Sequence, residues 1–284
     1  AGAFIQVQSS LRWFVDNFGA IADWRATLLR VASFRRAMLM SDALHPACGR
    51  IVYEEGPFDA ITLENLKIYS PAGCTMLDKG KIEVEPGQRV LVVGEPGAGK
   101  TLLFRALAGL WPWGAGRIGR PGGAAVSFMP RRPYLPPGTL REVLAYPRSA
   151  ENFETHAFTD ALARIGASRF APLLDRAARW DQELNADEQQ ALMLARLLLH
   201  RPRWVVLDEV LDAIDVETRA RAFEIFSRDL IDAAIVHIGR GDAADPSFTQ
   251  RLHIVKDPMI RRMVRAKAVE MATLPTGLHA TTAS

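Results

Sequence analysis

Cysteine is scarce in this sequence of 284 residues. Only Cys48 and Cys74 are present, and their spacing does not fit a metal-binding motif. Two cysteines cannot build the network of disulfides that stabilises small secreted proteins. The cysteine content therefore excludes a disulfide-rich scaffold and favours a reducing, cytosolic environment.

Long hydrophobic runs and blocks of like charge are also missing. No stretch reaches the ~18 apolar residues of a membrane-spanning helix, so no complete transmembrane helix is expected in this sequence. No secretory signal is visible. The net charge is +3 and the arginines are scattered, which is typical of a solvated surface and gives no indication of nucleic-acid binding.

What remains is the composition of a globular protein with a substantial core. Hydrophobic residues make up 49% of the chain and charged residues 24%, which is ordinary for a folded domain. The length allows one large domain, or one domain with an appendage. The first residue is Ala rather than Met, which leaves open that the chain is a trimmed or excised segment.

Residues 1–45 contain no proline and place apolar side chains at helical spacing, so a helix is expected, with a break near Gly19. The segment is rich in Phe and Trp, with charges interspersed. Two interpretations stay open: the helix packs on a partner or lies near a membrane surface, or it packs on the same chain. Residues 46–57 hold Pro, Gly and Glu and are expected to form a linker.

The rest of the chain alternates strand and helix patterns. "ITLENLKI" and "KIEVEP" indicate a small antiparallel sheet before the buried strand "RVLVVG". "AAVSFM", "RWVVLDE" and "AAIVHIG" are further expected strands, residues 139–200 are mostly helical, and "RLHIVKDPMIRRMV" indicates a terminal hairpin. This alternation predicts an α/β fold with a parallel sheet. The tail after Leu274 is small and polar, which favours disorder.

The segment "GEPGAGKT", residues 94–101, matches the pattern G-x-x-x-x-G-K-[ST] in full. A loop of this kind turns its backbone N–H groups towards a polyphosphate, and the following helix adds the positive end of its dipole. Lys100 is expected to reach the β- and γ-phosphates, and Thr101 to ligate Mg²⁺. The predicted nucleotide-binding residues of the loop are Gly94, Glu95, Pro96, Gly97, Ala98, Gly99, Lys100 and Thr101.

Two carboxylates end the expected strand "RWVVLDE". Asp208 supplies the oxygen ligand that Mg²⁺ requires beside a phosphate loop, usually through water. Glu209 is placed to polarise an attacking water, and it is the predicted catalytic base. An acidic pair at a strand end is a weak signal alone, but it is a strong one downstream of a phosphate loop.

The order of these motifs resembles the ATP-binding domain of an ABC transporter. "LFRALAGLWPWGAGRI", "FMPRRPYLPPGTLREVLAYP" and "ARLLLHRPRWVVLDE" are similar to the peroxisomal fatty-acyl subfamily, subfamily D, and to its bacterial SbmA/BacA-like relatives. The resemblance implies a P-loop NTPase with a RecA-like core sheet flanked by helices, a small antiparallel β subdomain and a helical subdomain. It places the ATP-binding domain at 58–256, its helical subdomain at about 131–200, and a terminal strand and disordered tail at 257–284.

The same resemblance implies a half-transporter, in which a membrane domain is fused to the ATPase and two subunits form a dimer. Two ATP molecules with Mg²⁺ then lie between the phosphate loop of one subunit and the signature motif of the other. Residues 1–45 correspond to the end of the last membrane helix and the connector. The implied partners are a transmembrane domain and a second ATP-binding domain, in a homo- or heterodimer without nucleic acid, on the cytoplasmic face of a membrane such as the bacterial inner membrane.

Three motifs depart from the family pattern. Arg131 stands where a glutamine normally contacts Mg²⁺ and the attacking water; arginine accepts no hydrogen bond, so it repels Mg²⁺ or pairs with phosphate. The signature reads "LNADE", residues 184–188. Asn185 can still cap a helix, but Asp187 sets a carboxylate against the partner's γ-phosphate. Arg240 replaces the histidine after the last core strand; it can contact γ-phosphate but cannot change protonation near neutral pH.

Other positions keep the pattern in part. The turn "DAID" retains Asp215, so a contact with the second subunit is expected there. His237 lies within the expected last core strand, where it is interpreted as a satisfied core residue. Tyr69 is the candidate for stacking on adenine, one residue from the usual position, which Ser70 fills.

Two functions are compatible with these residues. The first is a transport ATPase that couples ATP binding and weak hydrolysis to transport, impaired by Arg131, Asp187 and Arg240. The second is a pseudo-ATPase that binds Mg-ATP as a structural or regulatory subunit. This function favours a heteromeric assembly, because a homodimer would carry each altered motif twice. A soluble ATPase of nucleic-acid metabolism is disfavoured, because the chain has neither a second ATPase domain nor a basic face. Fatty acyl-CoA, peptides and cobalamin are all compatible substrates by resemblance.

Overall fold

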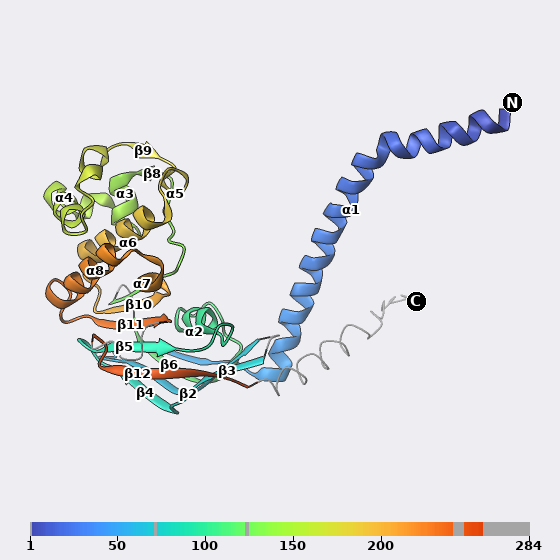
Figure 1. Ribbon diagram of the computed structural model, residues 1–284. Helices are drawn as coiled ribbons and strands as arrows, with labels where there is room; N and C mark the ends of the chain where they lie inside the picture. Colours follow the sequence, from blue (N-terminus) through green and yellow to red (C-terminus); the bar gives the residue numbers. More distant parts are fainter. Residues whose placement is uncertain (1, 71–72, 123–124, 241–246, 258–284) are drawn as a thin grey trace, which may run out of the picture.

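The computed structural model describes residues 2–70, 73–122, 125–240 and 247–257. Figure 1 shows one long helix, α1 (Gly2–Cys48), projecting from a body in which a curled sheet is covered by helices. The body holds two hydrophobic cores, one on each face of the parallel strands. The predicted α/β class is confirmed.

The helical backbone of α1 continues through Gly19, so the predicted break is wrong, although Figure 1 shows a bend in the axis of this helix. A single glycine weakens a helix by only about 1 kcal/mol relative to alanine, which the flanking turns tolerate. Trp13, Trp24 and Phe34 are each more than half exposed. These three side chains are therefore not buried against the rest of this chain. Within the described part of the chain, no helix combines the length and the hydropathy needed to cross a bilayer.

The predicted linker at 46–57 contains a strand. Helix α1 runs to Cys48, and β1 (Val52–Gly56) pairs in parallel with β6 (Gly114–Pro121) at the edge of the sheet. The Tyr53 hydroxyl group lies 3.0 Å from the carbonyl oxygens of Ala106 and Trp111. This part of the prediction is wrong because a β-branched and an aromatic residue favour extended pairing, despite the turn-forming residues around them.

One ten-stranded sheet runs through the body in the order β1-β6-β2-β3-β12-β5-β11-β10-β7, with β4 paired to β2. The antiparallel part holds β2 (Ile61–Ser70), β3 (Gly73–Leu77) and β4 (Lys81–Val84); β2 pairs antiparallel with β3, with β4 and with β6. The parallel part holds β5 (Arg89–Val93), β7 (Val126–Met129), β10 (Trp204–Asp208) and β11 (Ala234–Gly239).

Strand β12 (Gln250–Asp257) joins the two parts of the sheet. Residues 250–253 pair in parallel with β5, and residues 254–257 pair antiparallel with β3. The first arm of the predicted terminal hairpin is therefore a bridging strand. The second arm and the predicted tail lie outside the described residues.

The helical part lies to one side of the parallel strands, as Figure 1 shows. Its elements are the helices α3 (Leu140–Ala145), α4 (Thr155–Arg164), α5 (Trp180–Glu183) and α6 (Ala186–His200), two 3₁₀ segments (Ala150–Asn152 and Ser168–Leu173), and the pair β8 (Gly138–Thr139) and β9 (Ala177–Ala178). The remaining helices are α2 (Lys100–Leu107), α7 (Val210–Ala213) and α8 (Val216–Arg228). Side chains alternate along each strand, so Leu91 and Leu207 join the core shared with the helical part, while Val90 and Val206 join the core around α2.

Candidate nucleotide-binding site

Four parallel strands end at one edge of the sheet and bring the predicted site residues together. Strand β5 runs into loop 94–99, β10 ends at Asp208, β11 ends at Gly239, and β7 leads to Arg131. The last residue of β5 pairs with Gly239, so these loops begin at the same level. The carboxyl edge of a parallel sheet is where ligands bind in such folds.

Loop 94–99 is held in shape by two neighbouring strands. The Thr75 hydroxyl group of β3 donates to the carbonyl oxygen of Ala98 at 3.0 Å, and the Lys256 amino group of β12 donates to the carbonyl oxygen of Gly97 at 3.0 Å. Gly97 and Gly99 have φ values of +80° and +106°, and a Cβ atom at Gly99 would collide with Thr75. The glycines of the motif are therefore required by backbone conformation and by close packing.

Lys100 is buried at the start of α2, with 7% of the residue exposed. Its amino group donates to the carbonyl oxygen of Gly94 at 3.2 Å and lies 3.6 Å from Oε1 of Glu209. The lysine therefore points back over the loop, towards the place where the pattern predicts the β- and γ-phosphates.

Thr101 and Asp208 meet across the site. The Thr101 hydroxyl group is 3.5 Å from Oδ1 of Asp208, a long hydrogen bond. Burial raises the pKa of Asp208 and outweighs the hydrogen bond from Thr101 and the charges of Arg105 and Arg131. One hydroxyl and one buried carboxylate fit Mg²⁺, which takes one or two protein oxygens and completes its shell with phosphate and water.

Glu209 follows directly after β10 in a left-handed conformation, with φ +54°. Its backbone N–H donates to the carbonyl oxygen of Ile238 at 2.8 Å, and its side chain is 18% exposed. Such a backbone is uncommon for a residue with a side chain and is found at functional positions. It turns the carboxylate towards the same space as Lys100.

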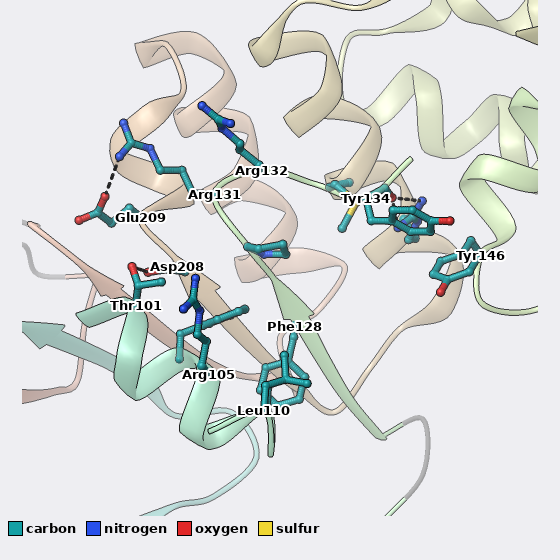
Figure 2. A pocket seen from close by; sticks show the side chains of 15 residues that line it. Thr101, Arg105, Leu110, Phe128, Arg131, Arg132, Tyr134, Tyr146, Asp208 and Glu209 are labelled. Carbon is teal, nitrogen blue, oxygen red and sulfur yellow. Dashed lines mark hydrogen bonds and ion pairs between the residues drawn. The ribbon is translucent and has the colours of Figure 1, made fainter. Parts of the chain in front are cut away.

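Arg131 joins the site through Glu209. Its Nη1 donates to Oε2 of Glu209 at 3.3 Å, as Figure 2 shows. The buried Gln190 of α6 donates from Nε2 to the Arg131 carbonyl oxygen at 2.7 Å. Gln190 was not predicted from the sequence; its signal is a polar residue at the start of the apolar stretch of α6.

Arg240 lies at the edge of the site through its backbone. Its N–H donates to Oδ2 of Asp212 at 2.7 Å, and its side chain is exposed. The same carboxylate oxygen lies 3.7 Å from Nε2 of His237. His237 is buried as predicted, but it is not fully satisfied, because its Nδ1 has no hydrogen-bond partner among the described residues. Asp212 was not foreseen as the residue that links these two.

The remaining predicted residues lie farther from the loop or serve local structure. Tyr69 pairs with Cys74, the residue before Thr75, and its backbone N–H donates to Trp113 at 3.1 Å. Asp215 caps α8 through a 2.9 Å hydrogen bond from the Thr218 N–H. The stacking role of Tyr69 and the subunit contact of Asp215 stay predictions.

The signature residues begin α6. Asn185 accepts the N–H of Glu188 at 2.9 Å, and the Glu188 side chain accepts the N–H of Asn185 at 2.9 Å. This capping box confirms the predicted helix cap. Asp187 is exposed in the first turn, where the helix dipole favours a carboxylate.

A cavity of about 710 Å³ opens beside Thr101, Asp208 and Glu209. Figure 2 shows it between α2, β7, the loop after β7 and α6. Four arginines are among its lining residues: Arg105, Arg131, Arg132 and Arg196. The lining therefore combines cationic side chains from α2, the loop after β7 and α6 with the acidic pair of Asp208 and Glu209.

Arg196 was also missed by the sequence analysis, although it is the one charge inside the apolar run "LMLARLLL" of α6. The guanidinium is buried and donates to the carbonyl oxygens of Val143 and Tyr134, at 2.5–3.2 Å and 3.3 Å. It also lies over the Tyr146 ring, 5.4 Å from its centre. Burial lowers the pKa of Arg196 to about 10, so it stays charged at neutral pH and fixes the loop that carries Arg131.

Comparison with known proteins identifies the family of this site. Residues 77–212 match the sequence profile of the ABC transporter family. An ABC transporter ATP-binding protein of Haemophilus influenzae is 32% identical over 196 residues, which are 69% of this chain and 33% of that protein. ABC transporter D family member 2 of Dictyostelium discoideum is 30% identical over 221 residues, which are 74% of this chain and 30% of that protein.

The inner membrane ABC transporter ATP-binding protein YddA of Escherichia coli is 26% identical over 238 residues, which are 83% of this chain and 40% of that protein. The chain thus spans about a third of the length of these curated relatives. Proteins of this family bind ATP through their ATP-binding domains. The phosphate loop, the carboxylate pair beside it and these similarities together show that the chain belongs to the ABC transporter family and carries its ATP-binding domain.

Proposed function

We propose that this chain is the ATP-binding domain of a half-transporter, which couples Mg-ATP binding and slow hydrolysis to transport across a membrane. One observation carries the proposal: Lys100, Thr101, Asp208 and Glu209 converge at the end of loop 94–99 from separate elements. Binding a polyphosphate, holding Mg²⁺ and activating water need these groups together.

Each residue has a defined task in the proposed reaction. The backbone N–H groups of loop 94–99 and the start of α2 bind the phosphates, and Lys100 turns from Gly94 and Glu209 towards the β- and γ-phosphates. Thr101 and Asp208 would hold Mg²⁺, whose charge would stabilise the phosphate oxygens. Glu209 accepts the proton of the attacking water.

Further contacts with nucleotide are proposed for residues at the rim of the site. Tyr69 stacks on adenine, and the Arg240 side chain reaches the γ-phosphate. The Arg240 backbone is fixed by Asp212, which leaves its exposed side chain able to adopt that position. Arg131 lies next to Glu209 instead of acting on Mg²⁺ directly.

A pseudo-ATPase is the second candidate, and the ion pair between Arg131 and Glu209 favours it. In this pair the proposed base, Glu209, is bound by the guanidinium group of Arg131, which cannot itself accept a proton. Asp187 adds a carboxylate at the start of α6, where it would face the γ-phosphate in the partner's site. In this case the chain binds Mg-ATP as a structural or regulatory subunit, and a catalytic partner performs hydrolysis.

The proposed partners are a transmembrane domain and a second ATP-binding domain. Helix α1 supports the first, because its exposed Trp13, Trp24 and Phe34 project from the body, as Figure 1 shows for the helix as a whole. The proposed location is the cytoplasmic face of a membrane, and the name of the Escherichia coli relative, an inner membrane protein, supports the bacterial inner membrane. Substrate choice is left to the membrane domain.

A paired measurement on the full chain tests the proposal: Mg-ATP affinity by calorimetry, and phosphate release under the same conditions. Binding at micromolar concentrations with release above the level of Lys100→Ala supports the transport ATPase. The same binding with release at the level of this control favours the pseudo-ATPase. Absence of Mg-ATP binding would contradict both.

A further inference from the structure

We propose that Arg131 is an inhibitory positioning residue, which holds the carboxylate of Glu209 and keeps hydrolysis slow until the two side chains separate. The inference rests on the proposed function, because it assigns Glu209 as the base. Figure 2 shows the two side chains facing each other beside the cavity, with Nη1 of Arg131 3.3 Å from Oε2 of Glu209.

Both oxygens of the Glu209 carboxylate face a cation. Oε1 lies 3.6 Å from the Lys100 amino group, and Oε2 accepts from Arg131. Phosphate would draw Lys100 away from Oε1, but Arg131 would still occupy Oε2. A guanidinium has five donors and no acceptor, so Arg131 can hold the carboxylate but cannot orient a water for it.

The backbones of both residues are fixed by hydrogen bonds, so the pairing is a property of the fold. Gln190, which is 3% exposed, anchors the carbonyl group of Arg131 to α6 at 2.7 Å. The N–H of Glu209 is bound to Ile238 of β11 at 2.8 Å. One partner is therefore tied to the helical part and the other to the sheet. A movement of α6 relative to the sheet would pull Arg131 from Glu209 and release the base.

The solvent exposure of Arg131 determines how much its removal should change the rate of phosphate release. Its side chain is 65% exposed, whereas that of Glu209 is 18% exposed. Exposed ion pairs are weak and breakable, so removal of Arg131 is expected to raise phosphate release by about two- to fivefold. Salt should have a similar effect, because raising it from about 0.1 M to about 1 M shortens the Debye length from about 10 Å to about 3 Å.

The test uses the full chain with Arg131→Gln, Arg131→Lys and the matched control Arg132→Gln. Arg132 lies next in the chain and is also exposed, and it forms no ion pair with a carboxylate of the described residues. We expect Arg131→Gln to raise kcat by about two- to fivefold with an unchanged KM for Mg-ATP. Arg131→Lys keeps the charge and should behave like the original chain, as should Arg132→Gln.

Two further readouts separate a positioning role from a structural one. Salt should raise kcat of the original chain but not that of Arg131→Gln. In a Glu209→Gln background, Arg131→Gln should have no effect on phosphate release, since the carboxylate is already gone. Both results are expected if Arg131 acts through Glu209.

The outcomes distinguish failure of this inference from failure of the proposed function. If calorimetry shows Mg-ATP binding but Arg131→Gln releases phosphate no faster than Arg132→Gln, the inhibitory role is overturned and the nucleotide site stands. A gain that persists in the Glu209→Gln background also overturns it. If no variant binds Mg-ATP, the proposed function fails and the inhibitory role fails with it.

Discussion

The phosphate loop is held from several sides, whereas the residues that depart from the family motifs lie on exposed ends of elements. Thr75 and Lys256 bind the backbone of loop 94–99. By contrast, Arg131, Asp187 and Arg240 are exposed. A substitution at a buried, hydrogen-bonded position disturbs packing, while a charge at an exposed loop end leaves the fold intact. Binding geometry and catalytic output can therefore change separately in this domain.

The largest effect is expected from a substitution of Glu209, which should change hydrolysis without changing Mg-ATP binding. Glu209→Gln removes the proposed base and keeps the shape of the side chain. Phosphate release should fall by about a hundredfold or more, while calorimetry should show Mg-ATP affinity within a few-fold of the original. Lys100→Ala serves as the control that loses binding itself. Unchanged phosphate release would assign the chain to the pseudo-ATPases.

The second prediction concerns the support of the altered loop. Arg196→Met should lower the free energy of unfolding by about 3 kcal/mol, because it removes the donors of the buried Val143 carbonyl group and of the partly buried Tyr134 carbonyl group. Urea unfolding measures the change. Arg132→Met, an exposed arginine of the same loop, should be nearly neutral. Equal losses for both variants would refute a specific anchoring role.

The third prediction uses Asp212, which ties the Arg240 end of β11 to α7. Burial raises the pKa of Asp212, but the nearby His237 ring and the hydrogen bond from the Arg240 N–H outweigh burial and lower the pKa below its usual value. The stabilisation is therefore present above the unfolded-state pKa of about 3.9 and is lost as the pH falls through the lower folded-state pKa.

Asp212→Asn should thus lower the free energy of unfolding by about 1 kcal/mol at pH 7. The loss should shrink as the pH falls below about 3.9. Unfolding curves at several pH values give this difference, with the exposed Asp232→Asn as the control. A difference that stays constant with pH would show that the charge of Asp212 contributes nothing.

The smallest expected effect concerns the altered signature. Asn185→Ala removes the cap of α6 and should lower the free energy of unfolding by about 1 kcal/mol. Thr139→Ala, which removes the matching capping box of α3, should cost a similar amount. Thermal unfolding compares the two variants. If Asn185→Ala is neutral while Thr139→Ala is not, the cap at the signature contributes no stability.

Local patterns explain why much of the site was predictable. The glycines of loop 94–99, the lysine and threonine that follow, and the acidic pair after β10 each depend on residues close in the chain. Strand alternation predicted a parallel sheet, and the structure shows that their loops meet at one edge of it. The cap at Asn185 was predictable for the same reason, because its partner Glu188 is three residues away.

Pairings between distant segments were not predictable from local pattern. Strand β1 joins β6, so the predicted linker was wrong, and β12, the first arm of the predicted hairpin, splits its partners between β5 and β3. Gln190 and Arg131 are 59 residues apart, and Arg196 and Tyr134 are 62 apart. The local sequence around one residue of such a pair does not indicate which distant residue it contacts.

The sequence by itself determined the phosphate loop, the carboxylate pair and the α/β class, because each depends on backbone conformation and side-chain spacing over a few residues. Only the tertiary structure decided what the altered residues contact. Arg131 faces Glu209 because a hydrogen bond from α6 fixes the backbone of Arg131 and a hydrogen bond to β11 fixes the backbone of Glu209. Asp212 links His237 and Arg240 because β11 and α7 meet there. Such contacts arise only when elements far apart in the chain pack together.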